Sequence, residues 1–361
     1  PRSATVSFHF FIHLANHIMV KSQVETVLGA VDAEDFGITL PHEHVTMDVS
    51  YYTTLPTTDE ERERYYAPIT MENLSWLRHN IYKSKVNVSI YNEQEAVITD
   101  LKAFKKAGGA TVVENTVIGI NRDIAKMVNI SKSSGVHLVC GTGYFVDPTV
   151  PGEMKSASVE KLAEIMISEI NDGIKDTKVK PGIIGEVGTS LPLTDFEKRS
   201  VRAAAEAQIQ TQTPVMLHPD ENPKAPFEIV RFFQEAGGDA RRCVMAHLDY
   251  AFPKDEQVIE FADMGTYLEY DFFGSEISYL VPRMSDLQRI EKVIKLIEHG
   301  YADKLLLSHD IHALHNLTKF GGIGFTHLLD YSVPKMLELG ISQAVIDKML
   351  ISNPKAWLTY Y

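Results

Sequence analysis

Eight short apolar runs, rich in Val, Ile and Leu, alternate with amphipathic helical stretches from about residue 20 onward. Such runs are typical of strands that are buried on both faces of a parallel sheet, and several helical stretches end in Gly, as a helix C-cap does. The eight runs lie at residues 37–44, 110–115, 136–141, 182–188, 214–219, 242–248, 265–271 and 304–310. Eight strands separated by helices predict an α/β fold of the (β/α)8 type, the TIM barrel.

A doubly wound open sheet is the alternative, but the first βα turn lacks the Gly-rich phosphate fingerprint that would support it. The chain length of 361 residues is ordinary for a barrel with insertions. We expect residues 19–361 to form one domain and residues 1–18 to be an N-terminal extension upstream of Met19. Residues 51–91 are predicted to be an insertion in the first βα loop, either an ordered lid or surface packing. Residues 352–358 predict a last helix across the barrel bottom.

The net charge of −13 argues against a nucleic-acid surface, because phosphate neutralisation needs clustered Lys and Arg. A small anionic substrate stays possible, since bound metal ions can reverse the local field. No segment is long and apolar enough to span a bilayer, and the apolar stretch near the N-terminus is short and interrupted by three histidines. Cys140 and Cys243 stand inside apolar runs and predict buried free thiols, hence a reducing, cytoplasmic location.

Residues that can bind metal ions stand at the carboxyl ends of the predicted strands, where the active site of a barrel lies. They are His42 and His44 on the first strand, Glu186 on the fourth, His218 on the fifth, His247 on the sixth and Asp310 on the eighth. Six ligands are too many for one tetrahedral zinc ion but suit two ions, with the Glu186 carboxylate as a bridge. We therefore predict two divalent metal ions per chain. Zinc is expected, although the same ligands also accept manganese, cobalt or iron.

Each of these residues has an ordinary structural explanation when taken alone. His247 alone could be a core histidine, Glu186 a partly buried acid near a basic partner, and Asp310 a helix cap. The whole set at one end of a barrel favours a metal centre. Because strand residues alternate between faces, Glu43 and His309 are expected to point away from the metals, into the barrel wall.

The stretch "GITLPHEHV" resembles the first signature of the phosphotriesterase family, in the amidohydrolase superfamily. The stretches "GIIGEVGTSLPLTDFE", "VMAHLDYAF", "GTYLEYDFFG", "LLLSHDIHALH" and "NPKAWLT" resemble the branch of that family called phosphotriesterase-related proteins. The resemblance runs from near Met19 to the C-terminus. It implies that His42, His44, Glu186 and Asp310 bind the more buried metal, and that His218, His247 and Glu186 bind the more exposed one. The founding phosphotriesterases are bridged by a carboxylated lysine, so Glu186 argues against their activity here and fits the related branch.

The resemblance to this branch implies an amidase that hydrolyses N-acetyltaurine to taurine and acetate, so the expected partner is a small N-acylated amino sulfonate. In the expected mechanism, a metal-bridging hydroxide attacks the acyl carbonyl, and Asp310 carries its proton to the leaving amine. The residue pattern alone predicts only a binuclear metallohydrolase. Candidates for substrate contacts in the βα loops are Tyr144, Asn115, Tyr270 and His312.

Three other functions remain open at this stage. The barrel could be a lactonase or phosphoesterase of the same family, or a non-enzymatic barrel that binds metal. A single-metal deaminase is the third, but it would leave the bridging Glu186 unexplained. A homodimer is plausible for such a barrel.

Overall fold

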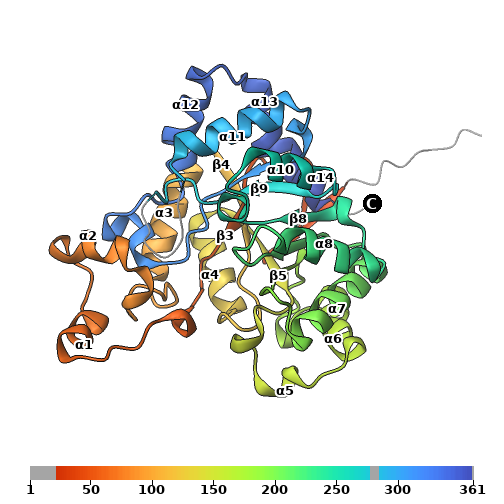
Figure 1. The fold of residues 1–361 in the computed structure, drawn as a ribbon, viewed down its shortest axis with the longest axis horizontal. Helices are drawn as coiled ribbons and strands as arrows, with labels where there is room; N and C mark the ends of the chain where they lie inside the picture. The colour runs from red at the N-terminus through yellow and green to blue at the C-terminus, as the bar shows by residue number, and fades with distance from the viewer. Residues whose placement is uncertain (1–21, 277–283, 360–361) are drawn as a thin grey trace, which may run out of the picture.

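The computed structural model describes residues 22–276 and 284–359, and it contains the eight predicted strands. They are β3 (Ile38–Glu43), β4 (Gly109–Glu114), β5 (His137–Thr142), β6 (Ile183–Gly188), β7 (Val215–His218), β8 (Cys243–Met245), β9 (Tyr267–Tyr270) and β10 (Leu305–Leu307). Neighbouring strands pair in parallel and in the order of the sequence. The strands lie at the centre of the molecule with helices around them (Figure 1).

The sheet closes on itself where the first strand meets the last. The backbone N–H of Asp310 donates to the carbonyl of His42 at 3.2 Å, and the N–H of His44 donates to the carbonyl of Ile311 at 3.1 Å. The Ser308 hydroxyl also donates to the carbonyl of His42, at 2.8 Å. The predicted (β/α)8 barrel is thereby confirmed.

The helical stretches expected between the strands are also present. The helices of the outer ring are α3 (Gln94–Lys106), α4 (Ile124–Ser134), α6 (Val159–Asp172), α7 (Asp195–Thr211), α8 (Ala225–Glu235), α10 (Asp255–Ala262) and α11 (Asp286–Glu298). Their ends follow local sequence signals. Thr194 and Glu197 form a capping box at the start of α7, and Gly135 ends α4 in the left-handed conformation, at φ 73°.

Shorter helices complete the fold. They are α5 (Gly152–Lys155), α9 (Leu248–Ala251), α12 (Val333–Glu338), α13 (Gln343–Asp347) and α14 (Asn353–Leu358). Trp357 of α14 is buried in the same apolar cluster as Val24 and Phe36, which precede β3. The last helix therefore packs at the amino end of the barrel and leaves the carboxyl end for a site.

A β-hairpin that the sequence did not predict precedes the barrel. Strands β1 (Gln23–Thr26) and β2 (Gly29–Asp32) pair antiparallel, and the turn between them needs the positive φ of Gly29, 107°. Val24 on β1 points into the buried cluster that contains Trp357. The hairpin thus helps to cover the amino end of the barrel. The predicted extension at residues 1–18 lies outside the described residues.

The insertion at residues 51–91 contains helices α1 (Asp59–Tyr66) and α2 (Met71–His79) and a 3-10 turn at Ile81–Lys83. Figure 1 shows α1 and α2 at one edge of the molecule, away from the barrel centre. The two ends of the segment return to the carboxyl side of the barrel.

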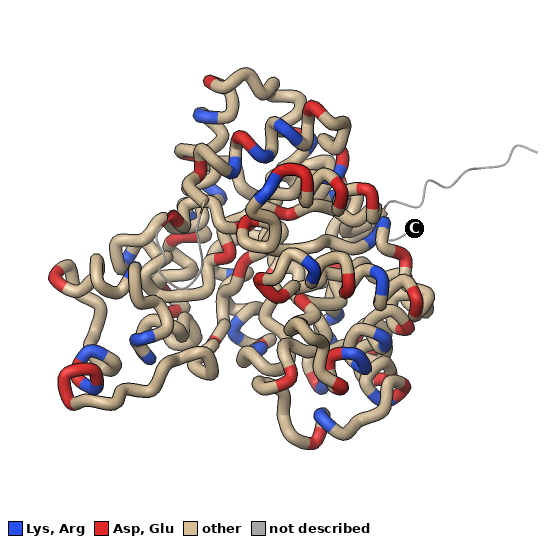
Figure 2. The backbone as a smooth tube through the Cα atoms, in the orientation of Figure 1, with Lys and Arg blue, Asp and Glu red and all other residues tan. Residues whose placement is uncertain are grey.

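Charged residues of both signs are interspersed along the outer helices (Figure 2). Cys140 and Cys243 are buried free thiols, as predicted. No helix within residues 22–276 and 284–359 is long and apolar enough to cross a membrane.

Candidate metal centre

The structure brings the six predicted ligands together at the carboxyl end of the barrel. Each stands within about three residues of the carboxyl end of its strand, so side chains distant in sequence meet over the barrel mouth. Their metal-binding atoms form two groups, His42, His44 and Asp310 in one and Glu186, His218 and His247 in the other. Glu186 also lies 3.4 Å from His44 of the first group.

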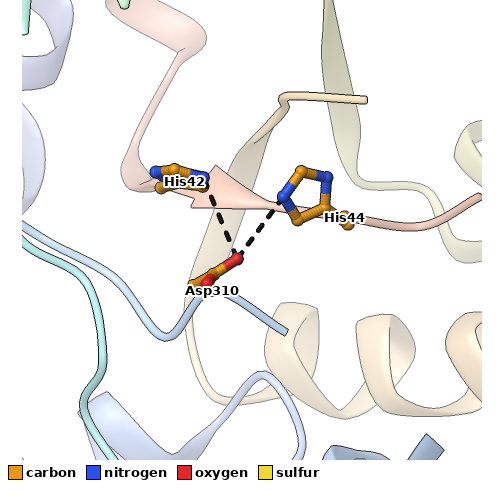
Figure 3. Close-up of side chains that lie close together, drawn as sticks. All are labelled: His42, His44 and Asp310. Atoms are coloured by element: carbon orange, nitrogen blue, oxygen red, sulfur yellow. Dashed lines mark ion pairs between the residues drawn. The ribbon is translucent and has the colours of Figure 1, made fainter. Parts of the chain in front are cut away.

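The first group joins the first and last strands. Oδ1 of Asp310 lies 3.4 Å from Nε2 of His44 and 3.8 Å from Nε2 of His42. Figure 3 shows this carboxylate oxygen facing both imidazole rings. A tetrahedral zinc ion with bonds of about 2.0–2.1 Å places its ligand atoms about 3.3 Å apart, close to these distances. All three side chains are buried.

The second group lies nearer the solvent. Oε2 of Glu186 is 2.8 Å from Nδ1 of His218 and 3.8 Å from Nε2 of His247. Nδ1 of His218 and Nε2 of His247 lie 2.9 Å apart. Two imidazole nitrogens and a carboxylate oxygen that converge in this way can supply three of the four ligands of a zinc ion, which leaves the fourth coordination position open.

Glu186 belongs to the second group and also reaches the first. Its Oε1 lies 3.4 Å from Nε2 of His44, and its Oε2 lies 3.5 Å from Nε2 of His42. The preceding residue must be glycine, since Gly185 has a φ of +126° and an added Cβ would lie 2.4 Å from the carbonyl oxygen of Met216. This close packing positions the glutamate between the two sets of histidines.

Two of the predicted ligands adopt an unusual backbone conformation. His247 has a φ of 59° and Asp310 a φ of 53°, both in the left-handed region that side chains other than glycine seldom adopt. Such strain costs about 1–2 kcal/mol per residue and is concentrated at functional sites. Both residues turn their side chains toward the ligand cluster where the strand has just ended.

The donor atoms fit divalent metal ions. Nε2 of His42 is buried and has no hydrogen-bond partner among the described residues, although it faces two carboxylates at 3.5 and 3.8 Å. An unpaired buried imidazole nitrogen is costly unless a metal ion uses its lone pair. The mixture of imidazoles and carboxylates suits zinc and other divalent transition metals.

Acidic residues that the sequence prediction missed contact the second ring nitrogens of His247 and His42. Asp271 follows β9, and its Oδ1 lies 2.9 Å from Nδ1 of His247. Glu269 lies on the same strand, and its Oε2 is 3.3 Å from Nδ1 of His42. The alternating acids of "YLEYD", at the end of a strand, were the signal available in the sequence.

A separate chain of hydrogen bonds supports His44. Its Nδ1 lies 2.9 Å from the Thr116 hydroxyl, which donates to the Glu114 carboxylate at 2.5 Å. Ligating histidines usually have a partner of this kind on their second nitrogen, and it fixes the ring orientation.

The electrostatics keep the central carboxylates ionised. Burial would raise the pKa of Glu186, but His218 holds this pKa well below its usual range. Burial acts in the same direction on Asp310, yet His312 and His44 hold its pKa well below normal. For Glu269, burial dominates and raises the pKa to about 8. Glu186 and Asp310 are therefore available as anionic ligands.

Glu43 and His309 lie on the opposite face of the strands, where the alternation places them. Nδ1 of His309 is 2.7 Å from Oε1 of Glu43, and its Nε2 accepts a hydrogen bond from the N–H of Leu328 at 3.0 Å. Both nitrogens of His309 are used in the barrel wall.

A cavity of about 470 Å³ opens above the ligands. Part of its wall is aromatic, formed by Tyr51, Tyr52, Tyr82, Phe145, Tyr250 and Phe272. The tyrosines at 51, 52 and 82 come from the 51–91 insertion, so this segment forms part of the cavity wall. Among the described residues, no Lys or Arg lines this cavity.

Of the four expected substrate-contact residues, only His312 lines the cavity, with its Nδ1 3.2 Å from Oδ2 of Asp310. Tyr144 is buried elsewhere: its hydroxyl donates to the carbonyl of Leu162 at 3.4 Å, and its ring packs edge-on against Phe196. It lies under helices α6 and α7 because the turn after β5 points it outward.

Asn115 and Tyr270 also lie outside the cavity lining. The Asn115 amide donates to the carbonyls of Pro41 and Val113, at 3.1 Å each, and so bridges β3 and β4. Tyr270 belongs to the apolar core between the barrel and its helices. It occupies the opposite face of β9 from its neighbours Glu269 and Asp271, since successive strand residues alternate.

An eight-stranded parallel barrel with imidazoles and carboxylates gathered at its carboxyl end is typical of a metal-dependent barrel hydrolase. The family model of the phosphotriesterase family matches residues 22–358, and the chain belongs to that family. The predicted family and the predicted hydrolase class are both confirmed.

Named relatives and a solved structure agree with this membership. The chain is 44% identical to an N-acetyltaurine hydrolase of Danio rerio, over 94% of this chain and 99% of the relative. It is 41% identical to a phosphotriesterase-related protein of Nematostella vectensis, over 95% of this chain and 100% of the relative. The crystal structure of a resiniferatoxin-binding protein from Rhodobacter sphaeroides superposes with a TM-score of 0.90 at 30% identity, covering 93% of this chain and 94% of that one.

Proposed function

We propose that this protein is a binuclear metal-dependent amidohydrolase that hydrolyses N-acetyltaurine, a small N-acylated amino sulfonate, to taurine and acetate. The observation that carries the metal centre is the position of Glu186, whose two oxygens lie 3.4 Å from His44 and 2.8 Å from His218. The substrate rests on relatives such as the Danio rerio N-acetyltaurine hydrolase, which the chain matches at 44% identity over nearly its full length.

Each residue has a defined part in holding the two ions. His42, His44 and Asp310 would hold the buried ion, His218 and His247 the exposed one, and Glu186 both. We propose zinc as the metal. When bound, two such ions polarise a carbonyl and lower the pKa of a nearby water toward neutrality.

Asp310 is the residue that moves the proton. Its carboxylate borders the cavity, where it is in place to accept a proton from the attacking water. The proton must then reach the leaving nitrogen, because an amide anion is a poor leaving group. His312 lies 3.2 Å from Oδ2 of Asp310 and orients this carboxylate at the cavity wall.

The cavity suits a small, partly apolar substrate. Its volume of about 470 Å³ lies within the range of small-molecule sites. Phe145, Tyr250 and Phe272 can cover a methyl or ethylene group. Since no Lys or Arg among the described residues lines the cavity, the sulfonate would rely on the positive field of the bound ions and on neutral donors such as the Thr194 hydroxyl.

The test is an assay of the purified protein with N-acetyltaurine, a lactone and an aryl phosphate, with zinc present. We expect release of acetate and taurine, and little turnover of the other two substrates. Efficient lactone or phosphate hydrolysis without acetate release would instead assign the lactonase or phosphoesterase function. Two bound ions with no hydrolysis of any substrate would favour a non-enzymatic barrel.

A further inference from the structure

We infer that Asp271 is a positioning residue that orients one histidine ligand of each metal ion. Its Oδ1 contacts His247 and its Oδ2 contacts His42. This inference rests on the proposed binuclear centre. It predicts that replacing the carboxylate by an amide weakens the exposed metal site and spares the buried one.

The contacts of Asp271 reach both ligand groups. Its Oδ1 lies 2.9 Å from Nδ1 of His247, a residue of the exposed group. Its Oδ2 lies 3.1 Å from Nδ1 of His42, a residue of the buried group. The same Oδ2 accepts the backbone N–H of His247 at 2.9 Å. All three side chains are buried, so water cannot replace these contacts easily.

The carboxylate sets the tautomer of both rings. Nε2 of His42 and Nε2 of His247 face the metal position, so these nitrogens must carry a lone pair. In a neutral imidazole the other nitrogen then carries the proton. Nδ1–H of His247 donates to Asp271, and Nδ1–H of His42 lies between Asp271 and Glu269. An ionised carboxylate accepts hydrogen bonds only, so it can receive both Nδ1–H groups at once.

An amide at position 271 cannot do this, because it offers one acceptor oxygen and one NH₂ donor. The oxygen is expected in the place of Oδ2, where it accepts from the backbone N–H of His247 and from His42. The NH₂ group then faces Nδ1 of His247 and favours the tautomer with the proton on Nε2. That tautomer cannot bind the exposed metal.

His42 has a second acceptor that His247 lacks. Oε2 of Glu269 lies 3.3 Å from Nδ1 of His42, and it can keep the proton on that nitrogen when Asp271 is changed. The position of Asp271 is itself well supported: its backbone N–H donates to Asp249 at 2.9 Å, and Asp249 pairs with the buried Arg289. The effect of an amide is therefore expected to fall on the exposed site.

The experiment is a zinc titration of the full chain, comparing wild type, Asp271→Asn and the control Asp100→Asn. Asp100 is also a buried carboxylate that accepts two hydrogen bonds, both from Thr318, but it lies outside the cavity. We expect two zinc ions in wild type and in Asp100→Asn. In Asp271→Asn the first ion should bind within a few-fold of wild type, and the second about 10- to 100-fold more weakly.

If Asp271→Asn binds each of the two ions as tightly as wild type does, the inference is overturned and the proposed function stays intact. Loss of the buried ion before the exposed one would have the same result. A wild-type protein that binds no zinc would overturn the proposed function as well. Because Asp271→Asn could fail to fold, ¹⁵N-imidazole spectra of zinc-loaded wild type provide a second test. His42 and His247 should both carry their proton on Nδ1, and a proton on Nε2 of either would contradict the inference.

Discussion

Oδ1 of Asp310 lies 3.4 Å from Nε2 of His44, so the carboxylate after the last barrel strand contacts the imidazole at the end of the first. The contact completes the ligand cluster at the seam where the barrel closes. It also places the proposed proton carrier beside the buried metal position.

Asp310→Asn should keep much of the bound metal, because the amide oxygen can still act as a ligand. It should lower kcat for N-acetyltaurine by about 10²- to 10⁴-fold, since an amide cannot accept and return a proton. Steady-state kinetics together with metal analysis check this. Near-normal kcat at full metal occupancy would exclude the proposed role of Asp310.

Glu186→Gln should remove the bridge between the two ions. A neutral amide offers one good ligand oxygen where the carboxylate offers two. The affinity for at least one ion should therefore fall about 100-fold or more, since losing the partner of a ligand already costs about 10- to 100-fold. Equilibrium dialysis with zinc measures the loss. A variant that still holds two ions at wild-type affinity would show that Glu186 does not bridge them.

Thr116→Val removes the hydroxyl that lies 2.9 Å from Nδ1 of His44. We expect the buried ion to bind about 10- to 100-fold more weakly, because His44 loses the partner that orients its ring. Thr266→Val is the matched control, since the buried hydroxyl of Thr266 has no hydrogen-bond partner among the described residues. If both variants bind zinc equally well, the hydroxyl of Thr116 does not support the metal site.

Asp286 should contribute to stability above its unfolded pKa of about 3.9 and lose that contribution as the pH falls. Burial would raise its pKa, but a contact of 2.6 Å with His327 and the N–H of Gly274 lower it in the folded state. The unfolded chain therefore binds a proton at a higher pH than the folded chain does. The measurement is urea unfolding of metal-free protein at about pH 6 and about pH 3, on either side of that pKa. The free energy of unfolding should fall less between these two pH values for Asp286→Asn than for wild type. An equal loss in both would contradict this sign.

The strands and the ligand set could be predicted because their signals are local. Each strand is a short apolar run, and a ligand such as His218 or Asp310 stands at the end of its own run. The barrel topology then brings these ends together, so no contact between distant residues had to be known in advance.

The residues that contact the ligand histidines on their second ring nitrogen could not be predicted in the same way. Whether Asp271 reaches His42 and His247 depends on the register of β9 against its neighbours and on the left-handed backbone of His247. The direction of Tyr144 depends on a turn that no periodic pattern describes, and this turn places its ring beside Phe196 and not in the cavity. The β1–β2 hairpin was missed because its strands are only four residues long.

The most direct test of the proposed function is the release of taurine from N-acetyltaurine by zinc-loaded protein, measured before chelation, after chelation and after zinc is restored. The account predicts turnover with about two zinc ions per chain, loss of turnover as the metal is removed, and recovery when both ions return. Undiminished hydrolysis by fully metal-free protein would contradict it, and so would a protein with two bound ions that leaves N-acetyltaurine intact.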